Sequence, residues 1–102
     1  MEKVKIPNQN KVIEILQQNQ IEFAAFFGSR AKGVATKNSD YDILVEFSPR
    51  ASIGIFEVSG IIEKIEHEVG NKVELVTKKY LHPLLKEEIL KTMRVLYDNR
   101  KR

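Results

Sequence analysis

The chain of 102 residues contains no cysteine and no tryptophan, and it has only two histidines, His67 and His82. Without cysteine it can form neither a disulfide framework nor a thiolate metal site, and two imidazoles make zinc a poor candidate. No apolar run approaches the ~20 residues of a membrane span, and no apolar signal segment follows residues 1–5. We therefore expect a cytoplasmic protein without a membrane anchor.

The charge is only mildly basic, with a formal net charge of +3 and a short basic tail at residues 99–102. Such a tail can contact nucleic acid or an acidic partner, although charged termini are more often simply solvated. Aromatic residues are not interleaved with basic ones, as stacking on single strands would require, so direct binding of nucleic acid is not expected. At this length, residues 1–102 form one domain that buries roughly two-thirds of its surface.

Hydrophobic periodicity predicts an α/β (α+β) fold in which helices pack on a small mixed β-sheet. Strands are expected at about 21–27, 41–47, 72–77 and 95–97. A first helix is expected after Asn8 or Asn10, with Val12, Ile13 and Leu16 buried, followed by a short helical turn at 30–36. A further helix is predicted from an apolar stripe that ends before Gly70, made of Ile55, Val58, Ile62, Ile65 and Val69. The last helix should run from Pro83 to about Met93.

A glycine and a serine follow the first predicted strand. At Gly28 the backbone can approach a phosphate without a Cβ in the way, and Ser29 adds a hydroxyl donor. A helical turn that begins there would direct free N–H groups at an anion. Gly28 and Gly33 also match the first half of a P-loop, but Val34-Ala35 stand where that motif needs Lys-Ser/Thr. The P-loop interpretation is therefore rejected.

Two aspartates open the second predicted strand. Asp40 and Asp42 should point to one face with their Cα atoms ~6.5 to 7 Å apart, whereas Tyr41 points to the core. Two carboxylates about 6 Å apart repel by roughly 3 kcal/mol at an effective dielectric constant of ~20. A divalent cation removes this cost, and Mg²⁺ prefers carboxylate oxygens together with substrate phosphates. The pair therefore predicts a site for a magnesium–nucleotide complex.

Nearby polar residues leave alternatives open. Arg30 and Lys32 are candidates for contacts with triphosphate oxygens, but they are equally interpretable as surface charges beside a polar loop. Ser29 as a covalent nucleophile would need a base, and neither histidine is close to it in the sequence or in any implied register. His82 is interpreted as a loop or cap residue, and His67 as a polar residue on a helix face.

Gly28-Ser29-Arg30, followed after an interval by Asp40-x-Asp42 and an apolar strand, resembles the signature of the polymerase-beta-type nucleotidyltransferase superfamily. In length the chain is similar to the minimal nucleotidyltransferase (MNT) domain proteins, which act as antitoxins beside HEPN-domain toxins. The resemblance covers about residues 9–98. It implies the superfamily's fold, ATP as substrate and Mg²⁺ as cofactor, with Asp40 and Asp42 as catalytic metal ligands and Gly28, Ser29 and Arg30 as nucleotide-binding residues.

The superfamily also uses a third carboxylate on a neighbouring strand, and Glu74 stands at the matching position within an alternating apolar run. Relatives often have Asp there, which is one methylene shorter. Three roles therefore stay open for Glu74: a metal ligand, a base that activates the attacking hydroxyl, or a solvent-facing strand residue.

The resemblance implies transfer of AMP from ATP to a tyrosine of a HEPN-domain ribonuclease toxin. The chain is too short to carry a further domain that seats an acceptor, so a partner must present it. Two other classes remain: an antitoxin that acts by steric binding alone, and a nucleotidyltransferase that modifies a small molecule or a nucleic acid end.

Overall fold

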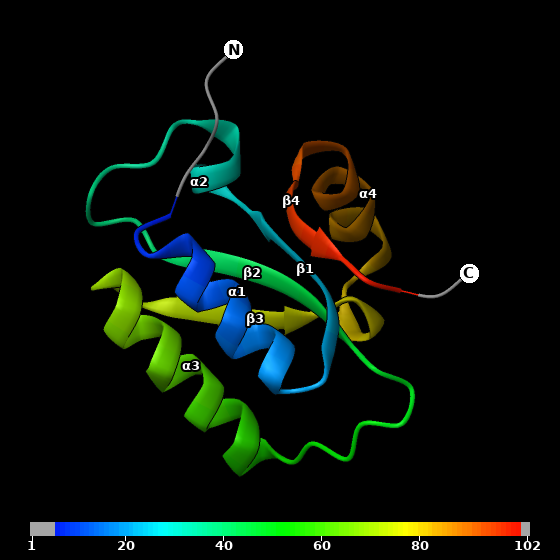
Figure 1. The fold of residues 1–102 in the computed structure, drawn as a ribbon. Helices are drawn as coiled ribbons and strands as arrows, with labels where there is room; N and C mark the ends of the chain where they lie inside the picture. The colour runs from blue at the N-terminus through cyan, green and yellow to red at the C-terminus, as the bar shows by residue number, and fades with distance from the viewer. Residues whose placement is uncertain (1–5, 101–102) are drawn as a thin grey trace.

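The computed structural model describes residues 6–100, and its order of elements agrees with the predicted α/β (α+β) domain (Figure 1). The elements are α1 (Gln9–Gln18), β1 (Ile21–Phe27), α2 (Ser29–Lys32), β2 (Tyr41–Phe47), α3 (Ile55–Val69), β3 (Val73–Thr77), the 3₁₀ helix η1 (Lys78–Tyr80), α4 (Pro83–Thr92) and β4 (Arg94–Asp98). None of the helices in residues 6–100 is long and apolar enough to cross a membrane.

The four strands form one mixed sheet in the order β3-β2-β1-β4. Strand β1 is antiparallel to both β2 and β4, whereas β2 and β3 are parallel. A parallel pair needs a crossover connection, and α3 supplies it. Because β2 and β3 run in the same direction, the residues that open these two strands lie side by side at one edge of the sheet.

The helices divide between the two faces of the sheet (Figure 1). Helices α1 and α3 cover one face and enclose the larger core, whose fully buried members include Leu16, Phe26, Ile43, Ile61 and Ile65. Helix α4 covers the other face, where Ile89 packs with Phe23, Ala25 and Leu44. Alternation along β2 explains the division, since Ile43 and Val45 belong to the first core and Leu44 to the second.

Some local predictions differ from the structure. In α1, Ile15 is buried instead of Ile13, together with the correctly predicted Val12 and Leu16. Asn8 is the N-cap residue, but its side chain does not cap α1: Nδ2 donates to the carbonyl of Glu68 at 2.9 Å and so ties α1 to α3.

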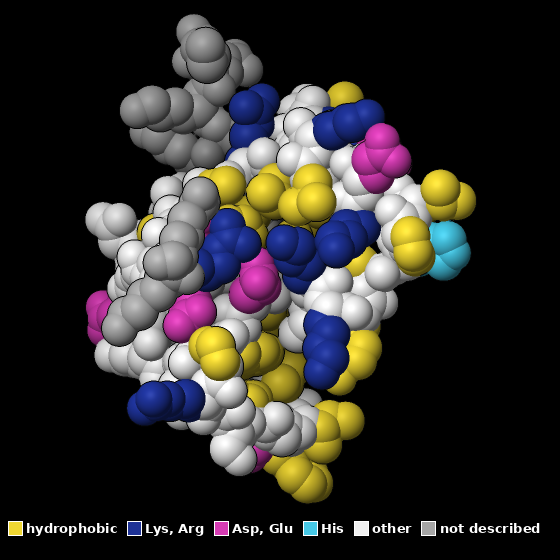
Figure 2. All heavy atoms as spheres, turned by 90° about the vertical axis from the view of Figure 1, so that its right-hand side faces the viewer, with side chains coloured by type: hydrophobic (Ala, Val, Ile, Leu, Met, Phe, Trp, Pro, Cys, Tyr) yellow, Lys and Arg dark blue, Asp and Glu magenta, His cyan; other side chains and the backbone are white. Residues whose placement is uncertain are grey.

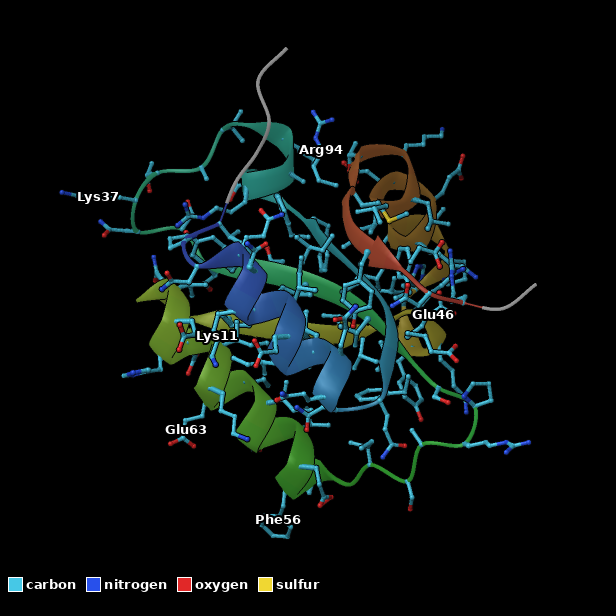
Figure 3. The ribbon with its side chains drawn as sticks, viewed as in Figure 1. Lys11, Lys37, Glu46, Phe56, Glu63 and Arg94 are labelled. Carbon is cyan, nitrogen blue, oxygen red and sulfur yellow. The ribbon has the colours of Figure 1, made fainter. Side chains whose placement is uncertain are left out.

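The apolar stripe of α3 is also shifted. Ile55 is 77% exposed, and Ile61 is buried beside Ile65 and Val69. A helix of this length extends about 22 Å, so its first turn reaches past the end of the sheet that it covers. Phe56, next to Ile55, projects from this turn away from the core (Figure 3).

Candidate active site

The turn between β1 and α2 has a backbone conformation that requires glycine. Gly28 has φ 75° and ψ −152°, a region that residues with a Cβ essentially do not occupy. A Cβ added at Gly28 would collide with Asp42 Oδ2 and would lie 3.4 Å from Asp42 Cγ. The helical turn predicted at 30–36 is the four-residue helix α2, which begins one residue earlier at Ser29 and ends already at Lys32. The glycine therefore lets the turn lie directly against a carboxylate of the next strand.

Strand register brings the predicted carboxylates to this turn. Asp42 pairs with Phe27 of β1 on one side and with Glu74 of β3 on the other. Asp42 shares a sheet face with Leu44, and Glu74 lies on the same face because Val73 and Leu75 pack into the opposite core. Asp40 directly precedes β2 and is exposed. Tyr41 is buried, as predicted.

The electrostatics of the site are unfavourable for its negative charges. The pKa of Asp42 is raised from 3.8 to about 6, first by burial, then by the charge of Glu74 and a hydrogen bond with it, and finally by the charge of Asp40. Both neighbouring carboxylates thus disfavour the ionised form of Asp42. The sequence spacing predicts the repulsion between Asp40 and Asp42, but the larger contributions to this shift come from burial and from Glu74.

Within residues 6–100, no three His, Cys, Asp or Glu side chains are already gathered around a common metal position. The donor chemistry of the cluster nevertheless fits a hard cation, because it offers only carboxylate oxygens. The raised pKa of Asp42 supports the fit, since a bound cation would stabilise the ionised form. Asp40, Asp42 and Glu74 are therefore the residues that could hold Mg²⁺.

The loop before Asp40 is held by two side chains. Arg30 Nη2 donates to the carbonyl of Ser39 at 2.7 Å, while its guanidinium stacks on the ring of Tyr41 at 3.9 Å. Asn71 Nδ2 donates to the carbonyls of Lys37 and Ser39, at 2.9 and 3.2 Å. Because Ser39 immediately precedes Asp40, both side chains fix the backbone that presents this carboxylate. Sequence analysis did not identify Asn71, whose only local signal is its place in a turn after a glycine.

The other polar candidates have definite positions. Lys32 forms an ion pair with Glu88 of α4, with 2.9 Å between Nζ and Oε1. His82 is the N-cap residue of α4, and its Nδ1 accepts from the N–H of Leu84 at 3.2 Å. His67 is exposed on α3. Neither histidine lies at the carboxylate cluster. Nucleotide binding by Ser29 and Arg30 stays a prediction.

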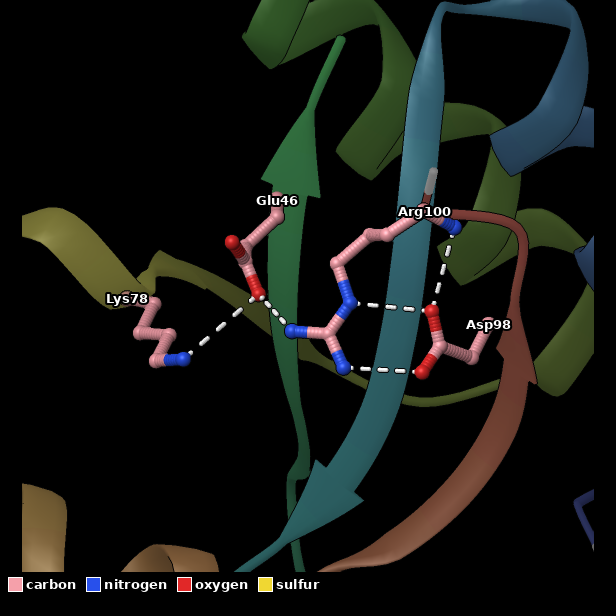
Figure 4. Close-up of polar contacts among 4 residues, drawn as sticks. All are labelled: Glu46, Lys78, Asp98 and Arg100. Atoms are coloured by element: carbon pink, nitrogen blue, oxygen red, sulfur yellow. Dashed lines mark hydrogen bonds and ion pairs between the residues drawn. The ribbon is translucent and has the colours of Figure 1, made fainter. Parts of the chain in front are cut away.

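Within the basic tail, Arg100 is not simply solvated, in contrast to the interpretation preferred for the tail. Arg100 donates through Nη1 to Glu46 at 2.6 Å, and through Nε and Nη2 to Asp98 at 2.9 and 2.8 Å (Figure 4). Its guanidinium also lies over the ring of Phe23 at 4.2 Å. Arg100 thereby joins the ends of β2 and β4 across β1. The last two residues of the tail lie outside the described part of the chain.

Comparison with known proteins identifies the family. A family model described as "Polymerase beta, Nucleotidyltransferase" matches residues 10–102. The chain belongs to the polymerase beta nucleotidyltransferase family. This nucleotidyltransferase is 35% identical over 82 residues to the Methanocaldococcus jannaschii protein named "Putative protein adenylyltransferase MJ0435", a match that covers 80% of this chain and 86% of that protein. A solved structure described as "Structure of putative minimal nucleotidyltransferase" is similar to it, with a TM-score of 0.71 and 26% identity, and the match covers 83% of this chain and 85% of that chain.

Solved structures share the fold. One is described as "Crystal structure of the toxin-antitoxin with AMP-PNP"; it has a TM-score of 0.76 and 23% identity, and the match covers 91% of this chain and 75% of that chain. Another holds tri-AMPylated Shewanella oneidensis HEPN toxin in complex with MNT antitoxin, with a TM-score of 0.67 and 20% identity over 89% of this chain and 70% of that chain. At these identities the likeness establishes the fold of this nucleotidyltransferase.

Proposed function

We propose that this nucleotidyltransferase is an antitoxin that transfers AMP from ATP to a tyrosine hydroxyl of a partner HEPN-domain toxin. The observation that carries the proposal is the register that places Asp42 between the Gly28 turn and Glu74. The name of the Methanocaldococcus jannaschii relative supports protein adenylylation, and the Shewanella oneidensis complex supports a HEPN toxin as acceptor. We expect this reaction to take place in the cytoplasm, because ATP and Mg²⁺ are available there.

In the proposed reaction, the tyrosine oxygen attacks the α-phosphorus of ATP, and the bond from this phosphorus to the oxygen of the β-phosphate breaks. Tyrosyl-AMP forms, pyrophosphate leaves, and the hydroxyl proton is released. Asp40 and Asp42 would hold Mg²⁺, which when bound neutralises negative charge on the triphosphate. Gly28 and Ser29 would bind the phosphates through backbone N–H and hydroxyl groups, while Arg30 holds the loop before Asp40.

Glu74 would accept the hydroxyl proton or serve as a third metal ligand. It is exposed on β3, next to Asp42 in register, so an incoming acceptor can reach it. Glu74→Gln separates the two roles. A base predicts a lower kcat with an unchanged Kd for ATP in the presence of Mg²⁺, whereas a ligand predicts that this Kd rises as well.

The direct test uses ATP labelled at the α-phosphate, Mg²⁺ and the protein encoded beside the gene of this chain, which the proposal expects to be a HEPN-domain protein. We expect label on that protein with wild type and none with Asp42→Asn or with a partner whose acceptor tyrosine is replaced by phenylalanine. An unlabelled partner would contradict the proposal.

Other outcomes of the same test identify the alternative classes. Neutralisation of the toxin by an Asp40/Asp42 double variant would show steric inhibition. A labelled product formed without any protein partner would show a small-molecule or nucleic acid acceptor.

A further inference from the structure

A groove of about 1390 Å³ lies away from the carboxylate cluster, at the opposite ends of β2 and β3. Its walls come from the loop after β2, the first turn of α3, η1 and α4, and its apolar lining includes Ile53, Ile55, Val58, Tyr80, Leu81 and Leu90. Small-molecule pockets usually measure about 300–1,000 Å³. The size of this open groove is therefore better suited to a segment of another protein.

The rim of the groove exposes apolar side chains that a folded domain normally covers. Of the eight large hydrophobic residues exposed in residues 6–100, six lie on α3's first turn, η1 or α4, and three of these, Ile55, Tyr80 and Leu90, line the groove. Ile55 is 77% and Tyr80 78% exposed, and α4 itself buries only Ile89 while three of its leucines remain exposed. Figure 2 shows hydrophobic side chains in and below the hollow on this face, with Lys and Arg side chains beside and above it. Exposed apolar side chains gathered along a groove are typical of an interaction site.

The charges of the groove indicate the chemistry of its occupant. Its lining contains three lysines and two glutamates, but both glutamates already have intramolecular partners. Glu46 is paired with Arg100 at 2.6 Å and with Lys78 at 3.8 Å, and Glu87 is paired with a lysine of α4 at 3.2 Å. Lys79 and Lys86 have no ion pair within the described part of the chain. The groove therefore presents uncompensated positive charge around an apolar centre.

The groove is connected to the candidate active site by two elements. Glu46, in its wall, and Asp42 stand four residues apart on the same face of β2, which corresponds to about 13 Å. Helix α4 lines the groove with Leu90 and contacts the end of α2, the helix that follows the Gly28 turn, through the ion pair of Glu88 with Lys32. A protein in the groove would thus lie on the sheet face that carries Asp42, about 13 Å along β2 from this residue.

We propose that the groove docks the acceptor protein through an amphipathic segment, with apolar side chains against Ile55, Tyr80 and Leu90 and carboxylates facing Lys79 and Lys86. This inference rests on the proposed function, because it assigns the surface by which a protein acceptor is presented. Burial of an apolar helix face in such a groove is a common recognition mode, and electrostatic complementarity gives it specificity. A second copy of this chain is disfavoured as occupant, since two basic rims with a net charge of +3 each would repel.

The test compares groove variants with matched controls in binding to the HEPN-domain protein named above. Tyr80→Ser removes an exposed apolar contact and Lys79→Glu reverses an exposed charge, so neither should lower the melting temperature appreciably. Lys64→Glu makes the same charge reversal, and Val95→Ser likewise replaces an exposed apolar side chain by serine, both at exposed positions outside the groove. We expect each groove variant to raise the Kd for the partner at least tenfold and the KM for it in AMP transfer similarly, with kcat and the Kd for ATP with Mg²⁺ unchanged. The controls should match wild type.

The outcomes distinguish this inference from the proposed function. If wild type labels the partner and the groove variants bind and label it equally well, the docking surface is wrong while the function stands. If wild type binds the partner through the groove but transfers no AMP, the function is wrong while the docking surface stands. Failure of wild type to bind the partner, or a dimer of this chain alone that Tyr80→Ser dissociates in sedimentation experiments, would also overturn the assigned occupant.

Discussion

Substitution of Gly28 by alanine perturbs the point where the turn after β1 touches the carboxylate cluster. The new Cβ would collide with Asp42 Oδ2, so this carboxylate would have to rotate away from Gly28. The backbone at Gly28, with φ 75° and ψ −152°, would in addition be strained by any side chain. Both the fold and the metal site should therefore suffer from a change of one methyl group.

The magnitude follows from these two effects. A residue with a Cβ in this region of backbone conformation costs about 1 to 3 kcal/mol, and displacement of a half-buried carboxylate adds to that cost. We expect Gly28→Ala to lower the free energy of unfolding by about 3 kcal/mol, which corresponds to about 12 to 24 °C in melting temperature for a domain of this size. Binding of ATP in the presence of Mg²⁺ should be lost even well below the melting temperature.

Two other glycines serve as controls in urea unfolding and ATP titration. Gly33 has φ 76° but open space around its Cβ position, so Gly33→Ala should cost about 1 kcal/mol without affecting Asp42. Gly60 lies within α3 with open space and no positive φ, so Gly60→Ala should be neutral or stabilise by up to about 1 kcal/mol. If Gly28→Ala is no more destabilising than Gly33→Ala and still binds ATP with Mg²⁺, the inferred contact with Asp42 is wrong.

Three further predictions concern charged side chains. The pKa of Asp42 in the fold, about 6, exceeds its ordinary value of 3.8, so its contribution to stability is complete below about pH 4 and is lost as the pH rises through 6. After a discount for solvent screening, Asp42→Asn should be about 1 kcal/mol more stable than wild type at pH 8 in urea unfolding without Mg²⁺. Equal stability of the two proteins at pH 8 would contradict the raised pKa. Arg30→Met should lower the free energy of unfolding by about 2 kcal/mol, because the stack on Tyr41 and the hydrogen bond to the Ser39 carbonyl are lost; an unchanged melting temperature would refute these contacts. Arg100→Gln should lower the free energy of unfolding by about 1 kcal/mol at low salt and by less in 0.5 M NaCl, as measured by chemical denaturation at both salt concentrations. A loss of stability that does not depend on salt would show that Arg100 contributes through packing on Phe23 and not through its ion pairs.

Much of the fold could be predicted because its elements carry strong local periodicity. The strands at 21–27 and 41–47 alternate or are continuously apolar, and both have the predicted bounds. Helix α3 also begins and ends as predicted, since Gly70 adopts the left-handed conformation that stops it. Periodicity does not reveal where the covered sheet ends, so the exposure of Ile55 could not be predicted.

The candidate site was partly predictable for the same reason. Asp40 and Asp42 are recognisable from their spacing, and Glu74 from its charged position in an apolar strand. The contacts of Asn71 and Arg100 depend on chain segments that lie 32 to 54 residues away in the sequence, as in the bonds from Asn71 to Ser39 and from Arg100 to Glu46. Neither residue has a local pattern that distinguishes it from other polar residues in turns and tails.

Calorimetric titration with ATP, with Mg²⁺ and then with EDTA, tests the central claim most directly, namely that the carboxylates at the Gly28 turn hold a cation that carries the nucleotide. At pH 8 wild type should bind ATP only when Mg²⁺ is present, and Asp42→Asn, folded and at least as stable, should not bind it. ATP binding that is equal with Mg²⁺ and with EDTA, or equal in wild type and Asp42→Asn, would contradict the account.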